Sequence, residues 1–132
     1  MSKALTKTYK ICPQGFPHQG EIYKVYFNPK KGQEINKIRP ALVISNNVQN
    51  EFDDQIVVVP LTSDPEEVKK ERPFTVLVKA NKENGLKKDS KLLLNRIQTI
   101  DVKLRLRDYI GKTNFAIIKQ TQIALKVVAG ID

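Results

Sequence analysis

Residues 36–47 read NKIRPALVISNN, with an arginine directly before a proline at the start of an apolar run. Because proline disfavours helical angles for the residue before it, Arg39 is expected in extended backbone at the beginning of a strand. A guanidinium fixed in this way either pairs with a carboxylate, with Glu34 and Asp101 as candidates, or binds an anion through two parallel hydrogen bonds. In the second case it can stabilise the negative charge that develops on a reacting phosphate.

Polar residues also lie at the ends of other predicted strands. Thr62 and Ser63 follow the apolar run IVVVPL, and the segment NRIQTID occupies residues 95–101. A threonine hydroxyl in this position can donate to a phosphate or to a leaving oxygen, or it can simply cap the next turn. Arg39, Thr62 and this segment are therefore the candidates for a polar site built from strand ends.

Several kinds of chemistry are excluded by the residues that the chain lacks. His18 and Cys12 are the single histidine and cysteine, which is too few for an ordinary zinc site or a histidine pair. The acidic pairs at 53–54 and 66–67 are adjacent residues, and adjacent side chains on a strand point to opposite faces. No phosphate-binding glycine loop and no GxSxG motif is present. Catalysis by this chain is thus expected to need no metal, nucleotide or other cofactor.

The composition favours a polyanionic partner. Lys and Arg number 23 against 14 Asp and Glu, which gives a net charge of +9. Residues 61–112 alone hold 13 basic and 8 acidic residues. Such a surplus favours nucleic acid, although an acidic protein would satisfy the same field. No apolar run approaches the roughly 18 residues of a membrane span, no secretory signal is evident, and the lone cysteine favours a reduced, cytoplasmic protein.

Hydrophobic periodicity predicts a mainly β fold. Residues 21–27 alternate, with Tyr23, Val25 and Phe27 on one face. Residues 40–45 and 55–61 are apolar at consecutive positions, which indicates strands covered on both faces. Further strands are expected within residues 74–80, 90–100 and 107–111. The pattern predicts a small curled antiparallel sheet or partly open barrel.

Helices are expected between and after these strands. A turn of helix is predicted after Asp64 and another within residues 101–106. A closing helix is capped by Thr113 or Asn114, and it gathers apolar residues on one side. Those residues are Ile117, Ile118, Leu125 and Val128. Residues 1–19 are broken by proline and glycine, so they are expected to be an N-terminal extension, as a tail or an added edge element, before a single domain over 20–132.

Three strings in this order resemble the MazF/PemK family of toxins from type II toxin–antitoxin systems. They are GEIYKVYFNPKKGQEINKIRPALVISNN, IVVVPLTS and GLKKDSKLLLNRIQTID. The resemblance covers residues 20–130. It implies a small SH3-like, partly open antiparallel barrel of the MazF/CcdB type with a C-terminal helix, assembled as a homodimer.

The resemblance also implies an activity. Family members are metal-independent, sequence-selective endoribonucleases that cut single-stranded RNA and leave 2′,3′-cyclic phosphate and 5′-hydroxyl ends. By this resemblance Arg39 and Thr62 are the catalytic pair. Expected partners are single-stranded RNA and an acidic cognate antitoxin, with a contact to DNA through the antitoxin complex. The resemblance places the RNA-binding residues at Gln33, Glu34, Ser63, Asn95, Arg96 and Gln98.

The chain departs from the family pattern near this site. Where many relatives read Q-[IP]-R-T-[IV]-D, this chain has RIQTID, so Arg96 and Gln98 exchange the usual side-chain types. Strand alternation would put the two on one face, so the exchange would either preserve function or shift the base preference. Gln33 stands where some relatives have His or Ser.

Two alternative functions remain: a basic barrel that binds RNA or protein without cutting, and a gyrase-directed toxin of the same fold.

Overall fold

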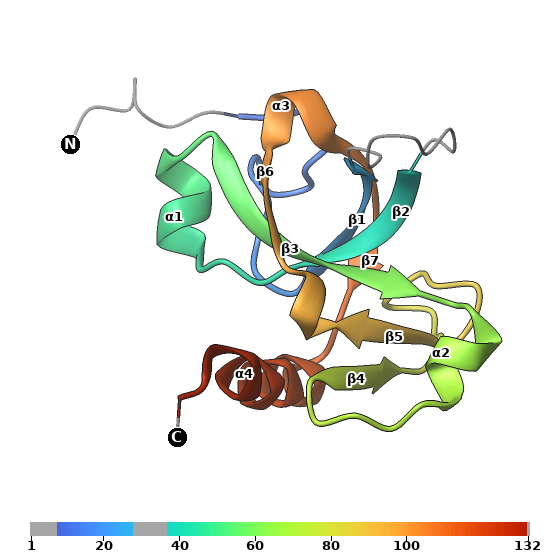
Figure 1. Cartoon of the computed structure of the whole chain (residues 1–132). Helices are drawn as coiled ribbons and strands as arrows, with labels where there is room; N and C mark the ends of the chain where they lie inside the picture. The colour runs from blue at the N-terminus through green and yellow to red at the C-terminus, as the bar shows by residue number, and fades with distance from the viewer. Residues whose placement is uncertain (1–7, 28–36, 132) are drawn as a thin grey trace.

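The computed structural model describes residues 8–27 and 37–131, and these residues form the predicted antiparallel sheet (Figure 1). The strand order is β4-β5-β3-β2-β1-β7, and β6 pairs with β3. All the pairings are antiparallel. The strands are β1 Glu21–Phe27, β2 Lys37–Val43, β3 Gln55–Thr62, β4 Thr75–Val78, β5 Ser90–Leu93, β6 Gln98–Asp101 and β7 Leu106–Lys112. The expected open barrel with a C-terminal helix is therefore confirmed.

Short helices fill the connections. They are α1 Asn47–Phe52, α2 Pro65–Lys69 and α3 Val102–Arg105, with a 3-10 turn at Leu94–Arg96 and the closing helix α4 Phe115–Ala129. The helical turns predicted after Asp64 and within 101–106 are α2 and α3. Helix α1 was not predicted. Its signal is Asn46, whose side chain accepts a hydrogen bond from the amide of Gln49 and so caps the helix.

Both faces of the central strands are covered, as the consecutive apolar runs predict. One core cluster includes Val25, Val43 and Val58, and it lies on the side that β6 and α3 close. The other includes Leu42 and Val59, and α4 covers it. Successive residues of β2 and β3 thus point into different clusters, which anchors these two strands more firmly than burial of one face would.

Helix α4 lies beside β4, at the end of the molecule away from α3 (Figure 1). Asn114 caps it by accepting the Ile117 amide at 2.9 Å, in line with the prediction. Of the predicted apolar face, Ile117 and Leu125 pack on the core, whereas Val128 is 41% exposed. The prediction for Val128 is wrong because the last turns of α4 run past the strands (Figure 1).

Residues 8–19 are turns and bends rather than an edge strand, and they pack on the sheet. Cys12 is buried in the core cluster with Val25, and burial raises its pKa above the usual value. Glu21 is buried as well, and it accepts hydrogen bonds from the Tyr23 hydroxyl at 2.9 Å and the His18 amide at 2.7 Å. The His18 ring stacks on Phe16, and its Nδ1 lies 2.9 Å from the Phe16 carbonyl oxygen, so the single histidine serves the packing of this segment. None of the described helices has the length and apolar character needed to cross a membrane.

Candidate active site

The register of β2 with β3 ends two residues short of both predicted catalytic residues. Antiparallel pairing runs from Val43 opposite Val58 to Ala41 opposite Pro60. Arg39 and Thr62 each lie two residues beyond the last pair, on the same strand faces as Ala41 and Pro60. Their side chains thus project from neighbouring strands on one side of the sheet.

Strand β3 changes partner at this level. Its last two residues pair with β5, where Leu61 is opposite Leu92 and Thr62 is opposite Lys91. The site therefore lies where β3 passes from the barrel half of the sheet to the half formed with β4 and β5. Arg39 is exposed and Thr62 is partly exposed, so both polar groups face solvent while their strands are buried behind them.

The sequence left open whether Thr62 caps a turn and whether Arg39 pairs with Asp101. The structure contains the Thr62 cap but not that ion pair. The Thr62 hydroxyl oxygen accepts the Asp64 amide at 3.2 Å, so it does cap the turn into α2. The bond uses a lone pair and leaves the hydroxyl hydrogen available to a ligand. Asp101 accepts the Leu104 amide at 2.9 Å and caps α3. Among the described residues no salt bridge forms to Arg39, so its pairing with Asp101 is not observed.

The remaining predicted residues are spread over a wider area. Ser63 is exposed directly after Thr62. Gln98 of β6 pairs with Val58 of β3. Val58 lies four residues before Thr62 along β3, which corresponds to about 13 Å between their Cα atoms. Arg96 lies on the 3-10 turn. Strand alternation consequently does not relate Arg96 to Gln98, and the expectation that they share a strand face is wrong.

Arg96 lies near enough to helix α2 for its charge to act on Glu67. The pKa of the Glu67 carboxyl is lowered first by the hydrogen bond from Lys70, and the charges of Lys70, Arg72 and Arg96 add to the effect. Asn95, also on the 3-10 turn, is exposed. Gln33 and Glu34 lie outside the described residues.

Lys91 is absent from the predicted site residues, yet it lies beside Thr62. It is opposite Thr62 on one side and Leu77 on the other, and it is only 5% exposed. Within the part of the chain that the structure describes, its ammonium forms no salt bridge. A single charge within the run SKLLL is a signal that could have found it, because alternation puts position 91 on the face opposite to Leu92.

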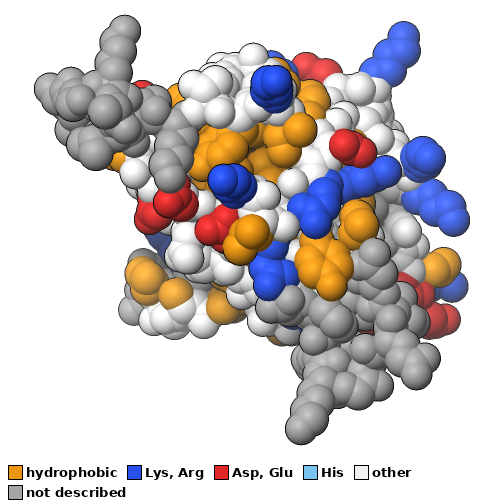
Figure 2. Space-filling view, turned by 90° about the horizontal axis from the view of Figure 1, so that it is seen from above, with side chains coloured by type: hydrophobic (Ala, Val, Ile, Leu, Met, Phe, Trp, Pro, Cys, Tyr) orange, Lys and Arg blue, Asp and Glu red, His pale blue; other side chains and the backbone are white. Residues whose placement is uncertain are grey.

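A second basic feature surrounds Tyr26. The guanidinium carbons of Arg105 and Arg107 each lie 5.7 Å from the centre of its ring, a cation–π geometry. Figure 2, which views the molecule from above, shows Lys and Arg side chains gathered on one half of this face. The sequence pattern marked these residues only as part of the general basic surplus.

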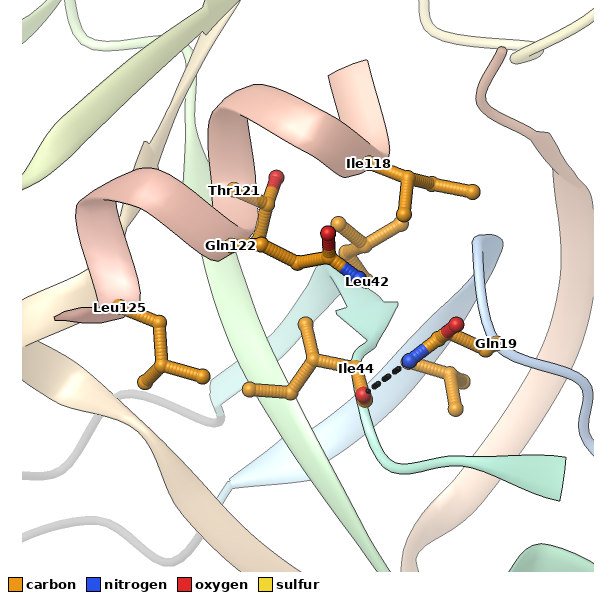
Figure 3. A pocket seen from close by; sticks show the side chains of 8 residues that line it. Gln19, Leu42, Ile44, Ile118, Thr121, Gln122 and Leu125 are labelled. Carbon is orange, nitrogen blue, oxygen red and sulfur yellow. Dashed lines mark hydrogen bonds between the residues drawn. The ribbon is translucent and has the colours of Figure 1, made fainter. Parts of the chain in front are cut away.

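A small pocket lies between α4 and β2, and Arg39 is not among its lining residues (Figure 3). It has a volume of about 30 Å³, and Gln19 bridges its mouth by donating to the Ile44 carbonyl at 2.8 Å. Its lining side chains are apolar, hydroxyl or amide groups. The described residues also hold no group of three or more His, Cys, Asp or Glu that could bind a metal ion. We therefore place the candidate site at Arg39 and Thr62.

The fold and the polar strand ends define a class of small open antiparallel barrels with a C-terminal helix. Within this class the chain belongs to the PemK-like, MazF-like toxins of type II toxin–antitoxin systems, whose family model matches residues 18–129. The chain is 37% identical over 114 residues to Endoribonuclease MazF9 of Mycobacterium tuberculosis, covering 83% of this chain and 92% of that protein. It is 33% identical over 109 residues to Endoribonuclease EndoA of Bacillus subtilis, covering 83% and 90%.

Solved structures share the fold at lower identity. A MazF from Deinococcus radiodurans superposes with a TM-score of 0.71 at 23% identity, over 88% of this chain and 98% of that one. A mycobacterial endoribonuclease in complex with its cognate antitoxin gives 0.69 at 23% identity, over 88% and 97%. These likenesses support the barrel architecture.

Proposed function

We propose that this protein is the toxin of a type II toxin–antitoxin system and that it is an endoribonuclease. It cuts single-stranded RNA at selected sequences without a metal ion, and by doing so it inhibits growth. The observation that supports this proposal is the register of β2 with β3, whose last pair, Ala41 with Pro60, lies two residues from Arg39 on one strand and two residues from Thr62 on the other. Such a pair can hold one phosphodiester between a guanidinium and a hydroxyl.

The chemistry assigned to this pair is an internal transfer of the phosphoryl group. The ribose 2′-oxygen attacks its own phosphorus, the bond from phosphorus to the 5′-oxygen breaks, and a 2′,3′-cyclic phosphate and a 5′-hydroxyl result. Negative charge builds up on the non-bridging oxygens, and Arg39 stabilises it with two parallel hydrogen bonds. The Thr62 hydroxyl donates to the phosphate or to the leaving 5′-oxygen.

The proton of the 2′-hydroxyl needs a separate acceptor. A guanidinium is not deprotonated in proteins, so Arg39 is a poor base. We assign the proton to Glu34, the carboxylate five residues before Arg39 in the same segment. The RNA strand is further held by Gln33, Ser63, Asn95, Arg96 and Gln98, with the last three reading its sequence.

The proposed assembly is a homodimer that an acidic antitoxin neutralises and brings to DNA. The support for a dimer is an apolar stripe on α4, formed by Phe115, Ile123 and Val127, which are spaced eight and four residues apart. Phe115 is 72% exposed, Ile123 64% and Val127 49%. An exposed stripe of this kind is typical of a surface that packs against another chain. A second copy is the proposed occupant.

The proposal is tested by incubating the pure protein with several single-stranded RNAs in excess EDTA. We expect cleavage with new 5′-hydroxyl ends and cyclic phosphates, and no cleavage of DNA of the same sequence, which lacks the 2′-hydroxyl. Intact RNA at micromolar protein across all the sequences would contradict the proposal. RNA binding without new ends would support the non-catalytic alternative, and inhibition of gyrase would support the other.

Replacement of Arg39 by Ala tests the assigned chemistry. We expect a loss of about 10³-fold in the rate of cleavage, the scale seen when a group that stabilises transition-state charge is removed. Because Arg39 is exposed, the melting temperature should change little. Arg72→Ala removes the same charge at the Glu67 salt bridge and is the control, with an expected change of less than twofold. An unchanged rate for Arg39→Ala would remove this residue from the mechanism.

A further inference from the structure

We propose that Lys91 is a further catalytic residue, the acid that protonates the leaving 5′-oxygen. This inference rests on the proposed ribonuclease function and deepens it. The chemistry assigned so far has a cation that stabilises charge and a base, but the new 5′-hydroxyl also needs a proton. A threonine hydroxyl can donate a hydrogen bond to that oxygen but is too weak an acid to give up its proton, whereas lysine is among the side chains that serve as general acids.

Lys91 shares a face of the sheet with Thr62. The two residues are directly opposite each other in the antiparallel pairing of β3 with β5. Side chains in such a pair point to the same face, and their Cβ atoms are about 5 Å apart. On its other side Lys91 is opposite Leu77 of β4, which is 38% exposed. The face that carries Lys91 and Thr62 is therefore open to solvent on both sides of the lysine.

The Lys91 side chain has a buried stem and an ammonium that reaches solvent. The residue as a whole is only 5% exposed. Among the described residues, every buried side-chain nitrogen or oxygen has a hydrogen-bond partner. The ammonium of Lys91 has neither a hydrogen bond nor a salt bridge within that part of the chain, so its nitrogen lies at the surface. Packing thus holds the stem and presents the charge.

The carboxylates of α2, the helix that contacts β5, are engaged elsewhere. Glu67 binds Lys70 at 3.1 Å and Arg72 at 3.5 Å. Asp64 uses its side chain to cap the first turn of α2. The positive charge of Lys91 is therefore not neutralised within the described residues, and it is available to an anionic substrate.

The order of the strands places Lys91 on the leaving-group side of the phosphate. Strand β3 lies between β2 and β5, so Thr62 has the strand of Arg39 on one side and that of Lys91 on the other (Figure 1). In an in-line displacement the attacking and leaving oxygens lie on opposite sides of phosphorus. Glu34, the assigned base, precedes β2 in the chain. With the phosphate at Thr62, the 2′-oxygen attacks from the β2 side and the 5′-oxygen departs toward β5.

The step balances in protons and electrons. As the bond from phosphorus to the 5′-oxygen breaks, its electron pair stays on oxygen, and the Lys91 ammonium transfers a proton to that oxygen. The products are a 5′-hydroxyl and a neutral amine. Glu34 then holds the proton taken from the 2′-hydroxyl, and this proton returns through water to the amine. The Thr62 hydroxyl is left to bind a non-bridging oxygen together with Arg39.

The test compares an RNA that carries its natural bond with one in which sulfur replaces the 5′-oxygen at the cleaved position. A thiol is far more acidic than an alcohol, so a sulfur leaving group departs without a proton and needs no acid. In single-turnover reactions Lys91→Met should cut the natural RNA about tenfold more slowly and the sulfur RNA within twofold of the unmodified rate. The exposed Lys79→Met is the matched control and should cut both at the normal rate.

Arg39→Ala provides the contrast, because it acts on the non-bridging oxygens and should slow both RNAs. Lys91→Gln repeats the comparison with a second neutral side chain, so the result does not depend on the folding of one variant. An equal loss on both RNAs, or no loss on either, would overturn the assignment of Lys91 and leave the ribonuclease function standing. Failure of the unmodified protein to cut the natural RNA would overturn both proposals.

Discussion

Arg39 is positioned by its backbone rather than by a partner side chain. Pro40 restricts it to extended angles, and β2 holds it opposite Val25 of β1. Because the guanidinium is exposed and forms no salt bridge within the described residues, it need not break an ion pair to bind phosphate. This arrangement reduces the reorganisation required during reaction, which is the property expected of a catalytic cation.

The Thr62 hydroxyl accepts a hydrogen bond from the Asp64 amide and can also donate one to a ligand, and two substitutions separate these roles. Thr62→Ala removes both, so we expect cleavage to fall about tenfold and the free energy of unfolding to fall by about 1 kcal/mol through loss of the bond from the Asp64 amide. Thr62→Ser keeps the hydroxyl and should stay within about threefold in rate. Single-turnover cleavage and denaturant unfolding give the two quantities. A serine variant as slow as the alanine variant would argue against hydroxyl donation.

Lys91 carries a prediction in which stability and activity change in opposite directions. Lys91 is 5% exposed as a whole residue and lacks a carboxylate partner among the described residues, so Lys91→Met, which keeps the buried stem and removes the charge, should raise stability by about 1 kcal/mol, a few degrees in Tm. The same change removes a positive charge beside Thr62 and should lower kcat about tenfold while KM changes little. Thermal unfolding and cleavage kinetics of one preparation measure both.

The exposed Lys79→Met is the matched control for Lys91 and should change neither quantity. A variant at position 91 that is more stable and fully active would show that the charge does not contribute to catalysis. A variant that is less stable would show that the ammonium has a favourable environment in the fold.

At the scale of elements, the turn between β4 and β5 is fixed by contact of its backbone with β7. Gly85 has a φ of +68°, and a Cβ added there would lie 2.2 Å from the Ile110 carbonyl oxygen. A Cβ on Gly111 of β7 would lie 2.3 Å from the Glu83 carbonyl oxygen. The turn and β7 thus approach too closely for a side chain at either glycine. This contact sets the position of the turn that carries Lys87 and Lys88.

Gly85 and Gly130 offer a matched pair for testing that contact. Both have positive φ, at +68° and +72°, but a Cβ on Gly130 would meet no atom within 4 Å. Gly130→Ala should cost about 1 kcal/mol from backbone strain alone. Gly85→Ala should cost about 2 kcal/mol more, because β7 must also shift. Denaturant unfolding measures the difference, and equal costs would show that the turn can move away from β7 freely.

At the scale of the whole molecule, the apolar stripe of α4 predicts the oligomeric state. Ile123→Asp places a charge in the middle of the stripe, so the proposed dimer should dissociate to monomers while the fold is retained, since this side chain is 64% exposed. Light scattering after size-exclusion chromatography measures the mass. Gln120→Asp, on the same helix but outside the stripe, is the control. A monomer before any substitution would contradict the proposed dimer.

The sequence predicted the parts of this fold that depend on local pattern. Alternation in residues 21–27 and the apolar runs of β2 and β3 were sufficient for the strands, and Asn114 for the start of α4. Helix α1 was missed because its segment is short and polar, so periodicity has little to act on. Val128 was misplaced because periodicity gives the face of a helix but not where the sheet beneath it ends.

The sequence alone determined the residue types available for chemistry and the extended backbone at Arg39. Both follow from covalent structure, which sets each side chain and restricts backbone angles over one or two residues. The tertiary structure decided which of these residues meet. The end of the β2–β3 register near Arg39 and Thr62, the pairing of Lys91 with Thr62, and the place of Arg96 on a 3-10 turn all depend on strand register and on the change of partner by β3. Those features arise from packing between segments far apart in the chain, which a local pattern does not encode.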